Sequence, residues 1–290
     1  WIIWIAIILK KPFLIVFMGV GPLNTRLGRW LTFYTCQKAR LITVRDTESY
    51  NHLIKMGIRK EKLHLTTDPA LFFPLNQISS EKNFTSPFPG NKYISVSLRE
   101  MPYPTTWLPV HISRKLPRNL RKTSGKINTT QMAGILDTII KEHTLKIVFI
   151  PFHQGVDEEI HQEIYHKMNA NPSANALIIR APTPQQFCYL CQQSEFVIGM
   201  RLHACILATR MRKPCIGLSY SPKVRNFFKY INSEHYCLDV PQFESRSMLH
   251  LIEEILTKKD LITQDLSCKI SEINQNFSQN DALLNTAFDL

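Results

Sequence analysis

The 290-residue sequence is 44% hydrophobic with only 10 glycines, which excludes a disordered or collagen-like chain and allows two domains, each with its own core. Lysine and arginine number 35 against 23 aspartates and glutamates, and this formal charge of +12 favours an anionic partner such as a phosphate-bearing substrate, nucleic acid or a membrane surface. A generally basic, solvated surface would give the same charge. No RNP, zinc-finger or basic-zipper motif occurs, so no nucleic-acid partner is expected.

The chain opens in an apolar run, WIIWIAIIL, which Lys10, Lys11 and Pro12 separate from a second run, FLIVFMGVG. The first run is too short to span a bilayer, which takes about 20 residues. A secretory signal carries positive charge before its apolar core, whereas here the lysines follow it. We therefore expect a buried helix that leads into a buried strand, in a chain whose true N-terminus precedes Trp1.

Short apolar runs then alternate with segments of helical periodicity. Strands are expected at 13–19, 41–46, 93–100, 145–152, 176–182, 196–201 and 214–220. Helices are expected at 26–39, 47–58, 129–143, 156–169, 184–194 and 202–212. Continuous apolar strands between amphipathic helices are typical of parallel sheets that are covered on both faces.

This pattern predicts an α/β protein with two Rossmann-like lobes, the first of them incomplete at its N-terminus. A polar, proline-containing stretch at 76–92 is the expected linker. Residues 1–75 are then the remainder of the first lobe, 93–232 the second lobe, and 233–290 a C-terminal helical segment. A basic, proline-containing segment at 101–126 interrupts the alternation, and we expect it to pass over the C-terminal end of the preceding strand.

Seven scattered cysteines include one C-x-x-C pair, Cys188 and Cys191. This spacing is found in redox pairs and in half of a zinc site, but no second C-x-x-C or histidine pair accompanies it. Because the pair lies in an expected amphipathic helix, we interpret both residues as buried structural thiols. The odd count and the lack of clustering favour a reducing cytoplasm.

Ligands of open parallel sheets bind at the carboxyl ends of the strands. Cationic, imidazole and glycine residues gather at the C-terminal ends of the expected strands or just after them: Gly19, Gly21, Arg45, Asp46, Arg99, His153, Arg180, Arg201, His203, Tyr220 and Lys223. A guanidinium group matches the geometry of a carboxylate or a phosphate, and helix N-terminal amides add further donors. The strand ends therefore predict a site for a small, multiply anionic ligand.

The segment GMRLH is the sharpest local feature. Gly199 permits a tight exit from its strand, and Arg201 and His203 then lie at the first turn of a helix, where the helix dipole favours an anion. In isolation, the arginine could simply be solvated, and a histidine in the first turn of a helix is more often a buried, hydrogen-bonded structural residue. Together with the other strand-end cations, they indicate a functional site.

Six segments, in order and spacing, resemble the polysaccharide pyruvyl transferases. They are GVGPL (19–23), ITVRDTESYNHLIKMGI (42–58) with TTDPAL (66–71), ISVSLRE (94–100), IPFHQGVDEE (150–159), VIGMRLHACILA (197–208) and KPCIGLSYSPKV (213–224). The resemblance implies the two-lobed fold of the glycosyltransferase-B type. It also implies transfer of pyruvate from phosphoenolpyruvate, as a ketal, to a sugar of a cell-surface polysaccharide or of its lipid-linked precursor.

The resemblance also implies roles for individual residues. The Arg-Leu-His motif of donor binding and acid catalysis falls on Arg201, Leu202 and His203, and the strand-end arginine of the family falls on Arg99. We expect His203 to donate a proton. His153 is either a second acid or base or a polar cap at its strand end, and Lys223 either contacts the anionic donor or lies on the solvated surface. The remaining candidates are assigned to the acceptor side or to the bracing of loops: Gly19, Gly21, Arg45 and Asp46. Neither a metal nor a cofactor is expected.

Two other functions remain open at this point. A sugar-nucleotide glycosyltransferase on the same fold would need a carboxylate for the ribose, for which Glu100 and Glu195 are the candidates. A non-catalytic glycan-binding relative is the other alternative. For a pyruvyl transferase with a lipid-linked acceptor, we expect a cytoplasmic location and peripheral association with the inner face of the membrane.

Overall fold

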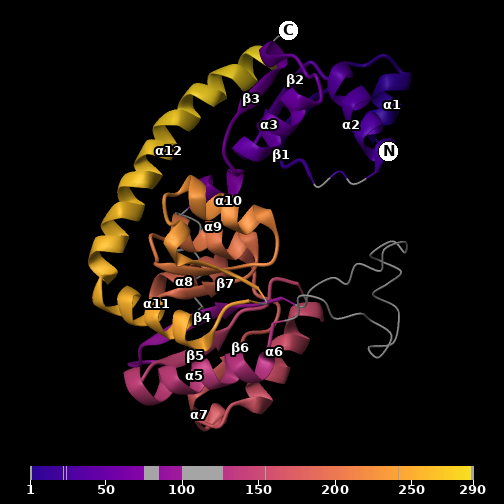
Figure 1. The fold of residues 1–290 in the computed structure, drawn as a ribbon. Helices are drawn as coiled ribbons and strands as arrows, with labels where there is room; N and C mark the ends of the chain where they lie inside the picture. Colours follow the sequence, from indigo (N-terminus) through magenta and orange to yellow (C-terminus); the bar gives the residue numbers. More distant parts are fainter. Residues whose placement is uncertain are drawn as a thin grey trace. The chain divides into compact units, whose positions relative to one another are not determined.

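The structure, a computed structural model, describes residues 2–21, 23, 25–74, 85–99, 127–153, 155–240 and 242–288, and the side chains of all of these except 156 and 276–288. The chain forms two compact units (Figure 1). One comprises Trp1–Phe72 with Cys268–Leu290, and the other comprises Phe73–Ser267. Most of the expected linker 76–92 and all of the basic segment 101–126 lie outside the described residues.

The second unit is built on a six-stranded parallel sheet. Its strand order is β6-β5-β4-β7-β8-β9. The chain therefore adds two strands on one side of β4 and then moves across to add three on the other side. The strands are β4 (Tyr93–Ser97), β5 (Lys146–Phe149), β6 (Ala176–Ile178), β7 (Val197–Gly199), β8 (Cys215–Ser219) and β9 (Cys237–Asp239).

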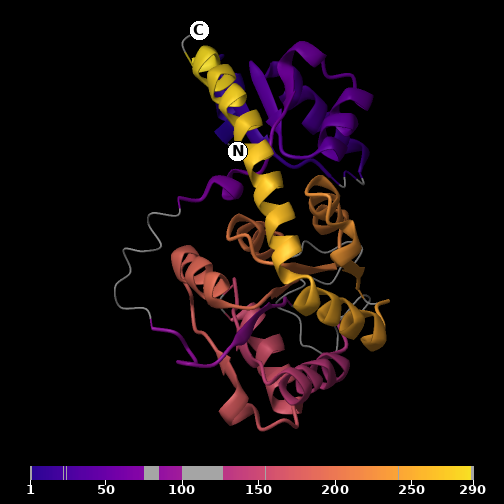
Figure 2. The same ribbon diagram turned by 90° about the vertical axis from the view of Figure 1, so that its left-hand side faces the viewer.

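Helices cover both faces of this sheet (Figures 1 and 2). On one face α5 packs against α6 and α11, and on the other α8 and α10 both pack against α9. Since the direction of strand addition reverses between β4 and β7, the boundary between these two strands is the topological switch point of the sheet. The helices are α5 (Thr129–His143), α6 (Val156–Lys167), α7 (Pro172–Asn175), α8 (Pro184–Gln193), α9 (Leu202–Arg210), α10 (Pro222–Tyr230) and α11 (Ser245–Thr257).

Burial and local capping explain why these segments take their observed form. Every residue of β4, β7 and β8 is buried, as expected of strands with helices on both sides. Helix α8 begins at a capping box, in which the Thr183 side chain accepts from the Gln186 amide while the Gln186 side chain accepts from the Thr183 amide. The Asn128 side chain likewise caps α5.

The first unit contains a three-stranded parallel sheet in the order β1-β2-β3, flanked by three helices. Its core is formed by residues of the sheet and of the helices after β1 and β2, including Ile15, Cys36, Ile42 and Leu53. The elements are α1 (Ile2–Ile8), β1 (Leu14–Met18), α2 (Arg26–Lys38), β2 (Leu41–Val44), α3 (Thr47–Lys55) and β3 (Leu63–Leu65). A long helix, α12 (Lys259–Phe288), begins in the second unit, and its residues from Cys268 onward belong to the first.

The predicted α/β class with parallel sheets is confirmed, but the expected burial of the N-terminal apolar run is wrong. The run does form a helix, yet α1 has no buried residue, and in β1 only Ile15 is buried. The C-terminal segment is mostly helical, as expected, and it also contributes the three-residue strand β9 to the main sheet. Within the part of the chain that the structure describes, every helix is too short or too polar to cross a membrane.

Candidate active site

Two arginines leave adjacent strands at the switch point of the main sheet. Ser97 at the end of β4 is in register with Gly199 at the end of β7, and the Met200 amide donates to the Ser97 carbonyl at 2.8 Å. Arg99 and Arg201 each follow two residues beyond this pair. The sheet register therefore places both guanidinium-bearing residues at the same edge, where ligands of this fold class bind.

A buried carboxylate holds Arg201. Its Nε donates to Asp157 Oδ2 at 2.9 Å and its Nη2 donates to Asp157 Oδ1 at 2.5 Å, in a bidentate pair. The Asp157 side chain is fully buried and also accepts from the amides of Phe152 and His153, at 3.1 and 2.9 Å. The Arg201 side chain is 20% exposed, and these bonds use two of its five N–H donors. The ion pair with Asp157 thus fixes the orientation of the Arg201 guanidinium and leaves N–H donors of this group for a ligand.

Arg99 is placed by Tyr220, which follows β8. Its Nη1 donates to the Tyr220 hydroxyl at 2.5 Å, and its guanidinium carbon lies 4.8 Å from the centre of the tyrosine ring. Burial lowers the pKa of Arg99, and the charge of nearby Arg201 lowers it further. Two like charges are therefore held close together in partly buried positions. An anionic ligand would relieve this repulsion.

His161 is a buried residue of the site that the sequence did not indicate. It follows Asp157 by one turn of α6, and its Nε2 accepts from the Leu98 amide at 2.9 Å. Burial, together with the charge of Arg201, lowers the pKa of His161 to about 3. The ring is thus neutral with its proton on Nδ1, and it holds the backbone immediately before Arg99. The feature of the sequence that could have indicated His161 is its position four residues after an aspartate, on the apolar face of an expected helix.

Helix α9 adds backbone donors at this edge. Arg201 is its N-cap residue and makes no capping bond with its side chain, so the first-turn amides are not satisfied by the cap. The close packing of the helix on β7 depends on Gly199, since a Cβ there would lie 2.7 Å from Cys205 Sγ. The GMRLH segment therefore positions both the Arg201 side chain and the N-terminus of α9.

The other candidates of the second unit lie on the loops and helices that begin at this edge. His203 is the second residue of α9 and is exposed, whereas Leu202 before it is half-buried. Exposed His153 follows β5 and is tied to Asp157 through its backbone amide. Lys223 is exposed at the second position of α10. Arg99 and Arg201 are thus brought together, while His203, His153 and Lys223 are exposed and lie on the segments that follow β7, β5 and β8.

A family model of polysaccharide pyruvyl transferases matches residues 1–222, a range that holds both arginines and the histidine of the GMRLH segment. The chain belongs to the polysaccharide pyruvyl transferase family. No curated protein sequence matches it.

Solved structures share the fold of this pyruvyl transferase family member at low sequence identity. A UDP-GlcNAc 2-epimerase from Methanocaldococcus jannaschii is similar with a TM-score of 0.60 and 16% identity over 89% of this chain and 67% of its own. A glycosyltransferase from Rickettsia africae has a TM-score of 0.58 and 14% identity over 97% of this chain and 71% of its own. Anabaena HepE in complex with UDP has a TM-score of 0.58 and 12% identity, with coverages of 99% and 75%. The expected glycosyltransferase-B-like fold is therefore confirmed.

The candidates in the first unit of this family member make contacts that brace loops. The Asp46 carboxylate caps α3 by accepting from the Ser49 amide at 2.7 Å, and it also accepts from the Ser49 hydroxyl. Arg45 pairs with the carboxylate of Asp68. A Cβ at Gly19 would lie 2.9 Å from Arg45 Nε, so the loop after β1 packs directly on this arginine. Gly21 has a φ of 117°, a backbone conformation that favours glycine.

The C-x-x-C pair is buried, as the sequence predicted. Cys188 and Cys191 both lie on α8 as free thiols. Burial raises the pKa of Cys188 to about 12, and that of Cys191 is also raised by burial. Thiols that resist ionisation are poor nucleophiles and poor metal ligands, and the pair packs in the core.

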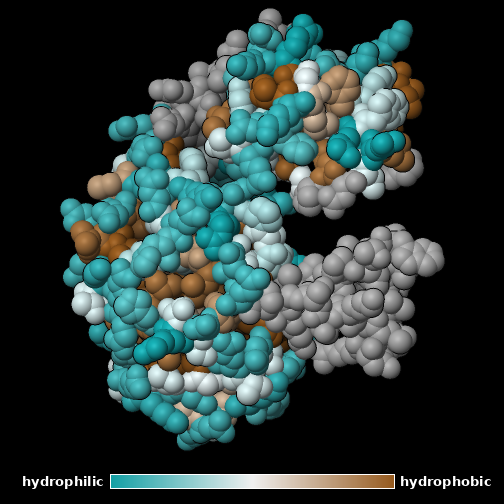
Figure 3. All heavy atoms as spheres, in the orientation of Figure 1, coloured by the Kyte–Doolittle hydropathy of each residue, from teal (hydrophilic) through white to brown (hydrophobic). Residues whose placement is uncertain are grey.

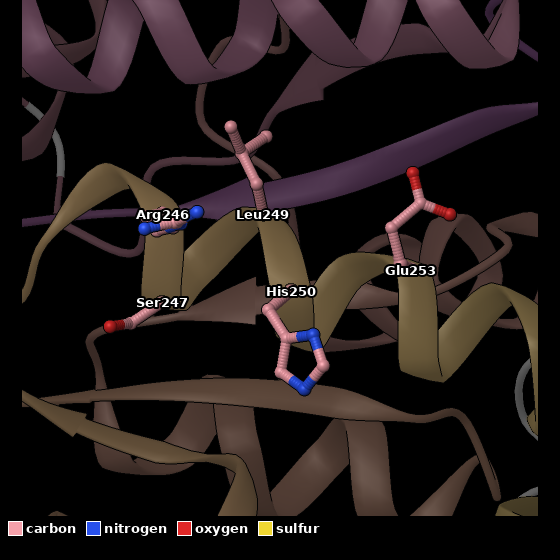
Figure 4. Close-up of a pocket in the computed structure, with 5 residues that line it drawn as sticks. All are labelled: Arg246, Ser247, Leu249, His250 and Glu253. Carbon is pink, nitrogen blue, oxygen red and sulfur yellow. The ribbon is translucent and has the colours of Figure 1, made fainter.

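A shallow hollow lies over α11, well outside the candidate site. Figure 4 shows that its five lining residues come from this one helix and that their polar groups point in different directions. One of them, Glu253, pairs with His143 at 3.1 Å, and Glu142 brings a third ligand atom within 4.8 Å of these two. Both glutamates are exposed. The hollow contains none of the residues that the sequence singled out.

Proposed function

We propose that this chain transfers pyruvate from phosphoenolpyruvate to two hydroxyls of a sugar, forming a ketal on a cell-surface polysaccharide or on its lipid-linked precursor. Membership of the pyruvyl transferase family supports a transferase of this kind. The observation that carries the proposal is the pair Arg99 and Arg201, which leaves adjacent strands at the switch point beside the start of α9. Phosphoenolpyruvate carries a phosphate and a carboxylate, and two guanidinium groups match these two anions.

In this proposal Arg201 and the first-turn amides of α9 bind one anionic group, and Arg99 binds the other. Asp157 offsets one positive charge and keeps Arg201 in a single orientation, as its bidentate bonds show. Exposed Lys223 adds a cation at the start of α10. Leu202 contributes its backbone amide.

The chemistry requires one proton donor and one proton acceptor. His203 as imidazolium donates a proton to the methylene carbon of the donor, so that C2 becomes electrophilic and bonds to the first sugar hydroxyl oxygen. The C2–phosphate bond then breaks, and the second hydroxyl oxygen bonds to C2. One hydroxyl proton returns to His203, and the other leaves with the phosphate, for which His153 is the proposed relay. Neither a metal nor a cofactor takes part.

A second candidate is a sugar-nucleotide glycosyltransferase, which the structural neighbours favour because several of them were solved with UDP or UDP-GlcNAc. Of its two candidate ribose ligands, Glu195 lies at the opposite edge of the sheet, because its amide donates to Tyr93 at the start of β4. Glu195 also pairs with Lys259. Glu100 lies outside the described residues.

The proposed place of the reaction is the cytoplasm, at the inner face of the membrane, where a lipid-linked acceptor would be presented. The scattered, unpaired cysteines and the family's acceptor class support this placement.

The test is phosphate release from phosphoenolpyruvate with lipid-linked glucose, galactose and N-acetylglucosamine as acceptors. His203→Gln should reduce the rate at least about hundredfold, the usual contribution of a general acid. His250→Gln, at an exposed histidine of α11, is the matched control and should keep the wild-type rate. Undiminished turnover in His203→Gln would remove this residue from the mechanism. Binding of the sugars without any binding of phosphoenolpyruvate would favour the glycan-binding alternative.

A further inference from the structure

Three side chains that can bind a metal ion meet where helices α5 and α11 pack against each other. Two of them, Glu142 and His143, are the last residues of α5, and the third, Glu253, lies on α11. His143 Nε2 lies 3.1 Å from Glu253 Oε1, and one ligand atom from each residue lies within 4.8 Å of the other two. We call these three side chains the α5–α11 cluster. All of it belongs to the second unit.

The charges of the α5–α11 cluster favour a divalent cation. Two carboxylates this close together repel each other unless a cation lies between them. A protonated His143 would offset one of their charges, whereas a divalent cation bound to the neutral imidazole would offset both. Among the described residues, the Glu142 side chain makes no hydrogen bond or ion pair, so its charge has no other partner there. The cluster also lies at the C-terminal end of α5, where the helix dipole favours a positive charge.

The ligand atoms of the cluster suit zinc. An imidazole nitrogen together with carboxylate oxygens binds Zn²⁺, whereas Mg²⁺ and Ca²⁺ prefer oxygen ligands throughout. Ligand atoms around a tetrahedral Zn²⁺ lie about 3.3 Å apart, because each is bonded at about 2.0–2.1 Å. The 3.1 Å between His143 Nε2 and Glu253 Oε1 already fits this spacing. Rotation of the exposed Glu142 side chain brings in the third oxygen from at most 4.8 Å, and water fills the fourth position.

The α5–α11 cluster is open to solvent and is separate from the candidate active site. His143 stands just before β5, so the cluster lies at the amino edge of the main sheet, opposite the strand ends that carry the two arginines. The imidazole is 19% exposed and lies between the helices, whereas the Glu253 side chain is 56% exposed. Figure 3 shows hydrophilic residues on the surface where Figure 1 places α5 and α11. In Figure 4 the Glu253 carboxylate and the His250 ring point to opposite sides of α11.

We propose that the α5–α11 cluster binds one Zn²⁺ ion, which joins α5 to α11 and stabilises the second unit. Because the cluster lies at the amino edge of the sheet, this ion takes no part in the proposed pyruvyl transfer. The inference goes beyond that function and does not rest on it. Its test needs no phosphoenolpyruvate, so either proposal can fail while the other stands.

The experiment is calorimetric titration of Zn²⁺ into the full chain, prepared without a histidine tag and stripped of metal by a chelator. Glu142→Gln, His143→Gln and Glu253→Gln are titrated in the same way. We expect the wild type to bind one Zn²⁺ ion that each variant binds at least about tenfold more weakly. Binding to the folded chain should also raise the Tm of the wild type. The same concentration of Mg²⁺ should leave the Tm unchanged.

Matched controls lie on the same helix. His250→Gln changes an exposed histidine that points away from the cluster, and Glu244→Gln changes an exposed acid at the start of α11. Both should bind Zn²⁺ as the wild type does. Circular dichroism shows whether each variant is folded, and Glu142→Gln keeps the test decisive because its side chain is exposed. Wild-type affinity in all three cluster variants, no binding by the wild type, or an equal response to Mg²⁺ would overturn the proposal.

Discussion

Arg201 is held by Asp157, a residue of another helix, through two parallel hydrogen bonds from one guanidinium to one fully buried carboxylate. The same carboxylate accepts from two backbone amides of the loop after β5. A single acid thus joins the ends of β5 and β7 across the central strand β4. The orientation of Arg201 is therefore set by the fold before any ligand binds.

Asp157→Asn tests this anchoring. Because the asparagine amide has a single acceptor oxygen, at most one of the two hydrogen bonds from Arg201 remains, and it is no longer made to a charged group. The amide NH2 then faces a guanidinium N–H, and the positive charge of Arg201 loses its counter-charge in a partly buried place. We expect the free energy of unfolding to fall by about 3 kcal/mol and the KM for phosphoenolpyruvate to rise at least about tenfold. Chemical denaturation and steady-state kinetics measure the two effects. Glu158→Gln, the next carboxylate along α6, is the control, and equal effects in both variants would contradict the anchoring role.

The neutral imidazole of His161 predicts a dependence of stability on pH. Its pKa is lowered to about 3 in the folded chain from 6.5, so between these values the unfolded state binds a proton that the folded state does not. The stability that the neutral ring contributes is complete above pH 6.5 and is lost as pH falls toward 3. The maximal slope from one such group is about 1.4 kcal/mol per pH unit.

Comparison of the wild type with His161→Gln isolates this contribution. The glutamine oxygen can still accept from the Leu98 amide but does not titrate, so denaturation between pH 6.5 and 3 should show a shallower loss of stability. Identical pH profiles would mean that the ring does not stay neutral. Because this hydrogen bond holds the backbone before Arg99, His161→Ala should also raise the KM for phosphoenolpyruvate, and His161→Gln should restore part of the loss.

Gly199→Ala tests the close approach of α9 to β7. The added Cβ would lie 2.7 Å from Cys205 Sγ, so this buried sulfur or the helix that carries it must shift, at a cost of about 1–3 kcal/mol. Cys205→Ala removes that sulfur, and the next contacts of the Cβ are at 3.5 Å. The double variant should therefore be more stable than the sum of the single changes predicts, as a denaturation cycle would show. Strict additivity would contradict the packing account.

Tyr220→Phe tests how Arg99 is positioned. The variant keeps the ring beneath the guanidinium and removes the hydroxyl that accepts from Arg99 Nη1. We expect the KM for phosphoenolpyruvate to rise about tenfold while kcat changes little, since the hydroxyl orients a binding group. Tyr230→Phe on α10 serves as the control. A fall in kcat with an unchanged KM would instead place the Tyr220 hydroxyl in the chemical step.

The sequence predicted the main sheet well because its strands are continuous apolar runs that end at charged residues. Arg99 and Arg201 could be placed at strand ends for the same reason. Asp157, the partner of Arg201, and the buried His161 could not be assigned to the site in this way, because both lie on α6. A helical pattern does not distinguish an acid that pairs with a distant arginine from a solvated acid. Strand β9 has only three residues, and the last of them is an aspartate. No apolar run in the sequence therefore indicated a strand there.

The N-terminal run shows where composition alone misleads. Its isoleucines and tryptophans predicted burial, but no residue of α1 is buried, although Trp4 of this helix stacks on Tyr34 of α2. Ile2, Ile5 and Ile8 are instead exposed. The sequence therefore predicted the helix correctly but not the exposure of its side chains.

Isothermal titration of phosphoenolpyruvate, and separately of UDP-GlcNAc, into the wild type and Arg99→Met tests the central claim most directly. We expect phosphoenolpyruvate to bind the wild type and to bind Arg99→Met at least about tenfold more weakly, because a charge-assisted contact at the switch point is lost. We also expect no binding of UDP-GlcNAc. Binding of UDP-GlcNAc without binding of phosphoenolpyruvate, or equal affinity of both proteins for phosphoenolpyruvate, would contradict the account.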